Sequence, residues 1–269
     1  MKLVLVVGAN GFLGSALVDK LLSQECEVVA VYNSSFDKIN KKAKIFTKEE
    51  LFDSNIQPDT VFYLSGNYAV PHEKLLVLND DLYKYSLRFP NSKMVYISST
   101  NVYGNSDQII TENSVFTNPG TYALSKIAGE FIVSSMKHFS ILRLAYIYGP
   151  GISNNSFIPH IINSAKENKK ITLFGNGERQ QDYIYIDDAV NMCLASALNQ
   201  NNNIYLGATG ISVSNKEIAE EIKKYTDCSI EYKSEETGKS FYFDPKKTFK
   251  ELNWNPTTTI SEGIQKMLV

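Results

Sequence analysis

Three glycines spaced three residues apart, Gly8, Gly11 and Gly14, follow an apolar run at the start of the sequence. The apolar run is typical of a buried parallel strand, and a glycine at its end permits a sharp turn into a helix. Gly11 leaves the first amides of that helix open, and these amides with the helix dipole attract a pyrophosphate. Gly14 lets the helix pack closely on the strand. The pattern predicts a dinucleotide-binding turn, the alternative being a glycine-rich turn of another α/β protein.

The length of 269 residues suffices for one large α/β domain or for a domain with a smaller lobe. A net charge of −2 gives no reason to expect nucleic acid or a membrane as a partner. Since no apolar run is long enough to span a bilayer and the early strand leaves no room for a signal peptide, we expect a cytoplasmic protein. The histidines show no metal-ligand spacing, so no metal site is expected. Reduced, mostly buried thiols are expected for three cysteines, Cys26, Cys193 and Cys228.

Runs typical of strands alternate with runs typical of helices through most of the chain. The predicted strands are 27–32, 60–64, 93–98 and 141–146, and helices are predicted at 80–88 and 122–138. This alternation predicts an α/β fold, a Rossmann-type doubly wound parallel sheet with a small C-terminal substrate lobe. We place the NAD(P)-binding domain at residues 1–150 and 182–207, and the substrate-binding lobe at 151–181 and 208–269.

A Tyr-x-x-x-Lys pair, Tyr122 and Lys126, lies downstream of hydroxyl-bearing residues that follow the predicted strand 93–98. On a helix the two side chains share one face, one turn apart. A free phenol has a pKa of about 10, and a neighbouring ammonium together with an oxidised nicotinamide stabilises the phenolate. The Ser99 hydroxyl is then placed to hold a substrate oxygen while Tyr122 exchanges a proton and nicotinamide a hydride.

Other conspicuous residues are interpreted as structural. A second Tyr-x-x-x-Lys match, Tyr242 to Lys246, contains Pro245, which disfavours a helix, so we treat it as accidental. Arg143 is expected to anchor loops, and Trp254 to pack the small lobe. Three carboxylates are interpreted as N-terminal residues that cap a helix running to residue 198, namely Asp182, Asp187 and Asp188.

The sequence resembles the extended short-chain dehydrogenase/reductases, often called NAD-dependent epimerase/dehydratases of nucleotide sugars. The similarity spans nearly the whole chain and is carried by residues 8–14, 63–66, 98–104, 122–126, 142–151, 174–177, 182–188 and 252–256. The resemblance implies catalytic roles for Ser99, Tyr122 and Lys126, and pyrophosphate binding by the amides of Phe12 and Leu13. It implies a cofactor site made of Gly8, Asn10, Gly11, Phe12, Leu13, Gly14, Tyr32, Asn33, Ser34, Leu64, Ser65, Gly66, Tyr122, Lys126, Tyr146 and Ile147. The implied substrate-binding residues are Ser99, Thr100, Asn101, Tyr146, Phe174 and Arg179, with no metal.

Departures from the family pattern bear on the cofactor. The acidic residue expected to bind the ribose 2′-hydroxyl at the end of the second strand is Tyr32, followed by Asn33 and Ser34. Without a carboxylate a 2′-phosphate is tolerated, and serine hydroxyls with the nearby Lys38 are able to bind it. The cofactor is therefore NADP or NAD, with NADP slightly favoured.

Further departures bear on the reaction. The Asp-Glu pair of 4,6-dehydratases is replaced by Thr100 and Asn101, which transfer protons poorly, so dehydration is not expected. Tyr146 replaces an asparagine that commonly contacts substrate. A phosphate-binding arginine is replaced by Gln181, with Arg179 nearby, and lysines stand where a second arginine is expected, which weakens diphosphate binding.

The reaction that the resemblance implies is hydride transfer at C4 of an activated sugar. A 4-keto-sugar reductase is favoured because the substrate lobe is small and the ribose carboxylate is missing. One alternative is a nucleotide-sugar 4-epimerase similar to UDP-glucose 4-epimerase. A second alternative is a non-catalytic, dinucleotide-sensing protein, which the intact Tyr122–Lys126 pair disfavours. By analogy with the family we expect a homodimer formed through the helix at 122–138.

Overall fold

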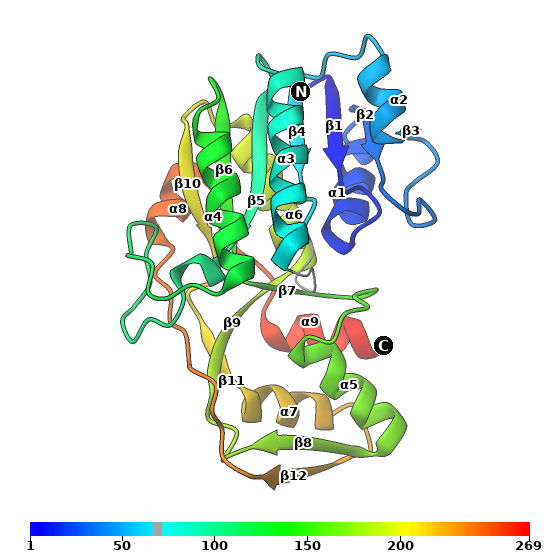
Figure 1. The fold of residues 1–269 in the computed structure, drawn as a ribbon. Coiled ribbons are helices and arrows are strands. Elements are labelled where there is room, and N and C mark those ends of the chain that lie inside the picture. Colours follow the sequence, from blue (N-terminus) through cyan, green and yellow to red (C-terminus); the bar gives the residue numbers. More distant parts are fainter. Residues whose placement is uncertain (67–71) are drawn as a thin grey trace.

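The computed structural model describes residues 1–66 and 72–269, and its largest element is a parallel β-sheet (Figure 1). Within these residues the sheet has seven strands in the order β10-β6-β5-β4-β1-β2-β3. The chain starts in the middle, proceeds to one edge and then to the other, which is the doubly wound arrangement. The predicted fold class is confirmed. The strands are β1 (Leu3–Val7), β2 (Glu27–Val31), β3 (Lys44–Phe46), β4 (Thr60–Tyr63), β5 (Lys93–Ser99), β6 (Phe139–Leu144) and β10 (Asn203–Gly207).

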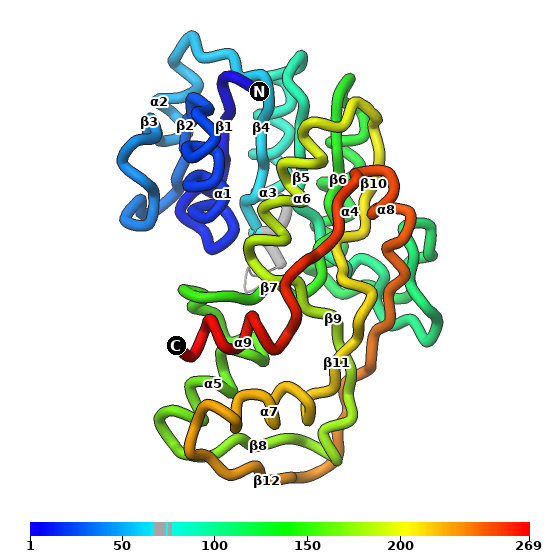
Figure 2. Tube along the Cα trace, turned by 180° about the vertical axis from the view of Figure 1, so that it is seen from behind, coloured from blue at the N-terminus to red at the C-terminus, as the bar shows by residue number. Residues whose placement is uncertain are grey.

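Helices cover both faces of this sheet because its strands bury both sets of alternating side chains. In β1, Val4 and Val6 pack into one apolar cluster, whereas Leu5 and Val7 pack into another. Helices α1 (Phe12–Ser23) and α6 (Ile186–Leu198) cover the first face, which Figure 2 shows toward the viewer. The opposite face is covered by α2 (Lys48–Asp53), α3 (His72–Arg88) and α4 (Thr121–Ser134).

A smaller lobe lies beyond the carboxyl ends of the strands, at the bottom of Figure 1. It holds a three-stranded sheet, β7 (Tyr146–Tyr148), β9 (Gln180–Tyr185) and β11 (Ser212–Ser214), and a two-stranded sheet, β8 (Lys170–Phe174) and β12 (Ser229–Lys233). Its helices are α5 (Phe157–Asn168), α7 (Asn215–Lys223) and α9 (Ile260–Leu268). The 3₁₀ helix η1 (Thr100–Tyr103) directly continues β5. The short helix α8 (Lys246–Leu252) contacts β10 and α6, so the C-terminal part of the chain returns to the large sheet.

Several predicted element boundaries differ from those observed. The predicted strand 141–146 is divided at Ala145 into β6, which joins the large sheet, and β7, which joins the lobe. Both segments are mainly apolar and neither glycine nor proline separates them, so no residue pattern marks the change of sheet. The predicted helix 122–138 ends at Ser134, and the predicted helix 80–88 begins earlier, at His72. The three cysteines are free, and Cys193 and Cys228 are buried as predicted, whereas Cys26 is half-buried.

The interpretation of the three carboxylates is confirmed in part: Asp187 and Asp188 lie in the first turn of α6, as predicted, but none of the three provides its N-cap. Helix α6 begins after Tyr185, which makes no capping hydrogen bond through its side chain. Asp182 lies in β9 and accepts hydrogen bonds from the backbone amides of Thr209 and Gly210. Asp188 accepts bonds from the Thr257 amide at 2.9 Å, the Thr257 hydroxyl at 3.0 Å and the Thr258 amide at 3.0 Å. The sequence does not show that Asp182 and Asp188 each hold a loop distant in the chain.

Removal of the Asp188 carboxylate tests its role in stability. Asp188 is 1% exposed, so Asp188→Ala leaves three partly buried donors without an acceptor and is expected to lower the free energy of unfolding by about 1–3 kcal/mol. The neighbouring Asp187 is exposed, and Asp187→Ala, the control, is expected to change it by less than about 0.5 kcal/mol. Urea denaturation of both variants measures the difference, and equal losses would contradict the assigned role.

Candidate active site

The glycine turn lies directly against the end of β4. Gly8 has a φ of +84°, and a Cβ atom there would lie 3.0 Å from the backbone nitrogen of Ser65. A Cβ on Gly14 would lie 2.2 Å from the carbonyl oxygen of Gly8, so α1 contacts the turn at its backbone. Gly11 is the N-cap of α1 and forms no side-chain capping bond. These two contacts give the turn and the close helix packing that the glycine spacing predicts.

The Tyr-Lys pair lies on the first two turns of α4. The Lys126 ammonium is buried and donates a hydrogen bond of 2.9 Å to the carbonyl oxygen of Ile97 in β5. It lies 5.8 Å from the centre of the Tyr122 ring and 5.1 Å from that of Tyr96. A Cβ atom on Gly66 would lie 2.7 Å from the ammonium nitrogen. Only a glycine at position 66 leaves room for Lys126 in this position.

Burial changes the protonation of Lys126. Desolvation lowers the pKa of its ammonium to about 8, and the negative charge of Glu130 opposes this effect. Below that pH the group is mostly a cation in a low-dielectric environment, where its field acts strongly on a nearby phenolate. The arrangement is chemically suited to stabilise a Tyr122 phenolate during proton transfer.

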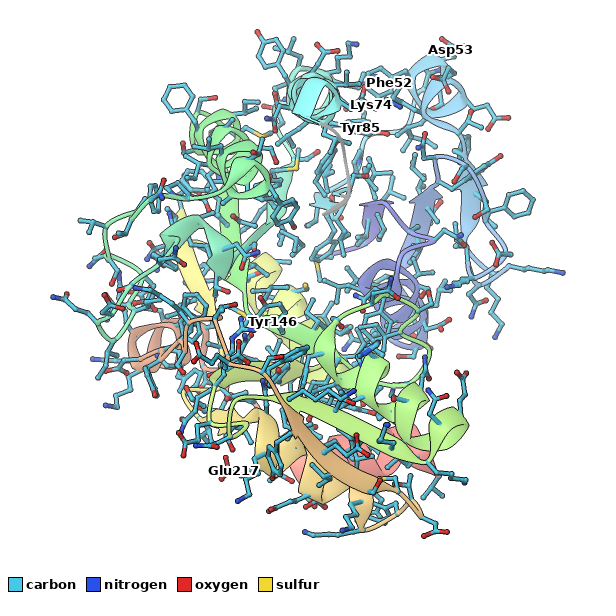
Figure 3. All side chains as sticks on the ribbon, turned by 60° about the horizontal axis from the view of Figure 1, so that its bottom comes forward. Phe52, Asp53, Lys74, Tyr85, Tyr146 and Glu217 are labelled. Carbon is cyan, nitrogen blue, oxygen red and sulfur yellow. The ribbon has the colours of Figure 1, made fainter. Side chains whose placement is uncertain are left out.

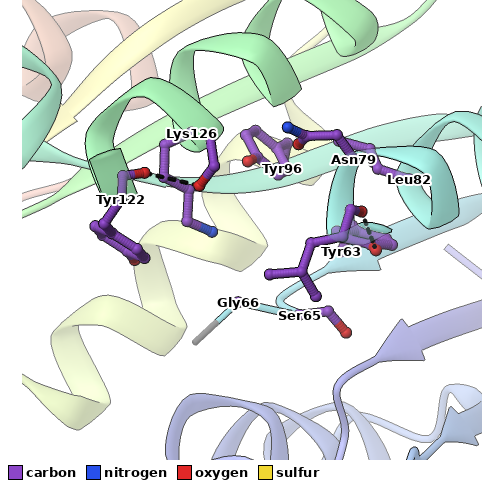
Figure 4. Close-up of a pocket in the computed structure, with 10 residues that line it drawn as sticks. Tyr63, Ser65, Gly66, Asn79, Leu82, Tyr96, Tyr122 and Lys126 are labelled. Atoms are coloured by element: carbon purple, nitrogen blue, oxygen red, sulfur yellow. Dashed lines mark hydrogen bonds between the residues drawn. The ribbon is translucent and has the colours of Figure 1, made fainter. Parts of the chain in front are cut away.

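These groups converge in one pocket. Figure 4 shows the Tyr122 ring and the Lys126 ammonium pointing into the same space as Ser65 and Gly66. The structure therefore brings together two predicted catalytic residues and two predicted cofactor residues. The remaining lining residues are Tyr63, Leu78, Asn79, Leu82, Tyr96 and Ser125.

A second pocket lies nearer the lobe and contains three predicted substrate-binding residues, Thr100, Asn101 and Tyr146. Tyr146 is partly exposed and lies where the large sheet meets the lobe (Figure 3). Two further lining residues, Phe241 and Phe243, were missed by sequence reasoning because they come from a distant C-terminal segment. The other lining residues are Gln181 and Asp182.

Ser99 lines neither of these two pockets. It is the last residue of β5, and its hydroxyl oxygen accepts a hydrogen bond of 3.2 Å from the amide of Asn101. The bond makes Ser99 the N-cap of η1. Its position after β5 places it at the carboxyl edge of the sheet, where ligands of open α/β sheets bind.

Two further predicted substrate-binding residues, like Ser99, line neither of these pockets. The Arg179 side chain donates a hydrogen bond of 3.0 Å to the carbonyl oxygen of Lys239 and packs on Gly238. Phe174 ends β8 and is 52% exposed. As predicted, Arg143 anchors loops, because it donates to the Tyr103 hydroxyl and to the Glu112 carbonyl oxygen.

The loop after β2 is attached to the glycine turn. The carbonyl oxygen at the end of β2, on Val31, accepts hydrogen bonds from the Gly8 and Ala9 amides. The Asn10 side chain donates to the Ser35 hydroxyl at 2.8 Å and to the Asp37 carboxylate at 3.2 Å. Hydrogen bonds lower the pKa of Asp37, the bond from Asn10 most strongly, followed by bonds from its own backbone amide and the Ser35 side chain. Asp37 was missed because it lies five positions beyond Tyr32, where the family pattern places an acid.

Comparisons with known proteins agree with this geometry. Residues 4–206 match the NAD dependent epimerase/dehydratase family, and the chain belongs to this family. The glycine turn and the Lys126 ammonium are suited to bind the NAD that the family requires. The protein is thus an enzyme of the NAD-dependent nucleotide-sugar epimerase/reductase family.

The chain is 26% identical to a dTDP-4-dehydro-6-deoxyglucose reductase of Escherichia coli, over 98% of this chain and 96% of the relative. It is 25% identical to a putative UDP-glucose 4-epimerase of Methanocaldococcus jannaschii, over 99% and 97%. Among solved structures, the UDP-glucose 4-epimerase of Thermotoga maritima with UDP-glucose has a TM-score of 0.88 at 23% identity, covering 99% of this chain and 97% of that one. At this identity the structural match establishes the fold.

Two other classes of site are absent from the described residues. Across residues 1–66 and 72–269, no group of three or more histidine, cysteine or acidic side chains is arranged to hold a metal ion. In the same residues, no helix is both long and apolar enough to cross a bilayer.

The protonation of Lys126 is directly measurable by NMR titration of the lysine side-chain signals. We expect its signal to titrate near pH 8, well below the ordinary lysine pKa of about 10.4. Burial also lowers the pKa of Lys93 to about 8, so Lys126→Met and Lys93→Met are needed to assign the two signals. A Lys126 signal that titrates at the ordinary value would contradict the account of the site.

Proposed function

We propose that the protein reduces the 4-keto group of a nucleotide-activated sugar. The proposal rests mainly on the convergence of Tyr122, Lys126 and Gly66 in one pocket beside the glycine turn. This is the placement that a proton donor needs next to a bound nicotinamide. The similarity to a dTDP-4-dehydro-6-deoxyglucose reductase supports the direction of the reaction.

In the proposed reaction, residues of this chain supply the proton and position the substrate. When bound, the reduced nicotinamide supplies a hydride to the carbonyl carbon of the substrate. Tyr122 donates its phenolic proton to the carbonyl oxygen, so that hydride and proton together convert the ketone into a hydroxyl group. Lys126 stabilises the phenolate that remains, and the Ser99 hydroxyl holds the substrate oxygen.

We assign the substrate-binding site to the second pocket and the adjoining lobe. We assign residues 151–181 and 208–269 as the substrate-binding lobe, except for α8, which contacts the large sheet, and we assign Thr100, Asn101 and Tyr146 as contacts of the sugar. Since neither Thr100 nor Asn101 carries a group that transfers protons at neutral pH, dehydration is disfavoured. Arg179 lies two residues before Gln181, which lines this pocket, and is our candidate contact for the diphosphate. Phe174 is retained as a predicted contact.

Two other functions are distinguishable from reduction. A 4-epimerase retains its NAD and shows no net redox change, and similarity to UDP-glucose 4-epimerases supports this second candidate. A non-catalytic dinucleotide sensor binds cofactor without turnover. The buried, paired Lys126 disfavours a sensor, because an unused ammonium in this position costs stability.

A substrate screen tests the proposal. Nucleotide sugars and their 4-keto forms are offered with both reduced nicotinamides, and turnover is read by nicotinamide absorbance and product NMR. Tyr122→Phe is expected to lower turnover about 10²–10⁴-fold while cofactor affinity changes little. The matched control is Tyr242→Phe in the second Tyr-x-x-x-Lys segment, which should retain full activity. Bound NAD without net redox during turnover would favour the epimerase, and unaltered turnover of Tyr122→Phe would remove this residue from the mechanism.

We also propose that NAD is preferred over NADP. The sequence favoured NADP because Tyr32 stands in place of the expected carboxylate, but the Asp37 carboxylate lies 3.2 Å from Asn10 in the glycine turn. A carboxylate beside the turn accepts hydrogen bonds from ribose hydroxyls and repels a 2′-phosphate.

Calorimetric binding of both dinucleotides measures this preference. We expect NAD to bind about tenfold or more tightly than NADP, a difference of about 1.4 kcal/mol or more. Asp37→Asn should reduce the ratio of the Kd for NADP to the Kd for NAD. Asp53→Asn at the exposed end of α2 removes the same charge and should leave this ratio unchanged. A wild-type protein that binds NADP more tightly would overturn the preference.

We propose that the protein forms a homodimer through α3 and α4. Leu124 and Phe131, seven residues apart on one face of α4, are exposed, Phe131 by 80%. Tyr83 and Leu87 on the adjacent α3 are also exposed. Light scattering after gel filtration should give a dimer for the wild type and a monomer for Phe131→Glu. A monomeric wild type would end this proposal.

A further inference from the structure

A buried ion pair lies one helical turn beyond Lys126. Glu130 of α4 and Arg143 of β6 are 6% and 4% exposed. Arg143 donates to both carboxylate oxygens of Glu130, at 2.9 Å from Nε and 2.7 Å from Nη2. The Ser98 hydroxyl donates a third bond of 2.5 Å to the same carboxylate.

Burying this ion pair costs desolvation free energy, and a contribution to stability alone does not account for its presence. Desolvation of two charges often outweighs their attraction, and apolar residues of similar size frequently stabilise a protein more. Here the hydrogen-bonding groups are well satisfied, because the third nitrogen of Arg143 donates to the Tyr103 hydroxyl at 2.9 Å and to the Glu112 carbonyl oxygen at 3.1 Å. A satisfied polar network of this kind fixes one arrangement of the elements that it joins.

The elements joined by the network carry the proposed catalytic residues. Glu130 is on the same helix as Lys126, four residues further along, so the two share a face. Ser98 immediately precedes Ser99 and is paired with Arg143 in the sheet register. Tyr103 ends η1, which carries Thr100 and Asn101. The carboxylate thus connects α4 to the end of β5 and, through Arg143, to η1.

Glu130 also acts on Lys126 through its charge. Its negative charge raises the pKa of the ammonium and partly offsets the effect of burial. The other titratable groups facing Lys126 are the Tyr122 phenol on the same helix and the Tyr96 phenol on β5. Burial raises the pKa of Tyr96, so that phenol stays neutral. Arg143 lies beyond Glu130 and carries the opposite charge.

We propose that Glu130 is a positioning residue for the reaction, which locks α4 to the end of β5 and so holds Tyr122, Lys126 and Ser99 in one geometry. The proposal rests on the reductase or epimerase chemistry proposed above. It assigns the ion pair to catalysis because a displacement of about 1 Å in a catalytic group costs about 100-fold in rate.

The test uses Glu130→Gln in the full-length protein, which keeps the shape and removes the charge. We expect kcat to fall about 10–100-fold, with KM and the Kd for NAD little changed. In the NMR titration the Lys126 signal should move below pH 8, because the ammonium loses the negative charge that raises its pKa. A purely structural role predicts a lower unfolding temperature with an unchanged kcat of the folded protein, and this result would overturn the proposal.

Two further variants keep the test decisive. If Glu130→Gln does not fold, Ser98→Ala removes one bond to the carboxylate without touching a charge, and kcat should then fall several-fold while the Lys126 titration stays near pH 8. An unchanged kcat in Ser98→Ala would contradict the positioning role. The double variant Glu130→Gln/Arg143→Met removes both charges and should regain stability but not kcat. Because the NMR measurement needs no substrate, it reads the effect of Glu130 even if the proposed substrate class is wrong.

Discussion

The hydrogen bond from the buried Lys126 ammonium to the Ile97 carbonyl oxygen is the interaction on which the site depends. It places a positive charge between α4 and β5, next to the Tyr122 ring and against the backbone of Gly66. A charge in this position is unfavourable for folding, since burial lowers the pKa of the ammonium. In the proposed reaction this charge stabilises the Tyr122 phenol as it loses and regains a proton near neutral pH.

The large sheet explains why these groups meet. Parallel strands end at one edge, so the glycine turn after β1, Ser65 and Gly66 after β4, and Ser99 at the end of β5 lie on the same side of the molecule. Two glycines then allow approaches that any side chain would prevent, between Gly8 and Ser65 and between Gly66 and Lys126. Two buried carboxylates, Asp182 and Asp188, accept hydrogen bonds from loops that are distant in the chain and so hold these loops in place.

Local patterns in the sequence predicted the fold class, the glycine turn and the pairing of Tyr122 with Lys126, because these depend on residues close together in the chain. Contacts between distant segments were not predictable in the same way. Phe241 and Phe243 reach the second pocket from the far C-terminal part of the chain, and Asp188 finds its partners at residues 257 and 258. The break between β6 and β7 was missed because both segments have the same apolar character. Asp37 was missed for a different reason, because it lies in the loop that Asn10 contacts and not at the position of Tyr32, where the family pattern places an acid.

The central claim is that Tyr122 and Lys126 face the nicotinamide of a dinucleotide bound over the glycine turn. A crystal structure of the complex with NAD tests it most directly. The account predicts the pyrophosphate at the amides that begin α1, and the nicotinamide ribose within hydrogen-bonding distance of the Lys126 ammonium and the Tyr122 hydroxyl. A dinucleotide bound elsewhere, or a nicotinamide ring out of reach of Tyr122, would contradict it.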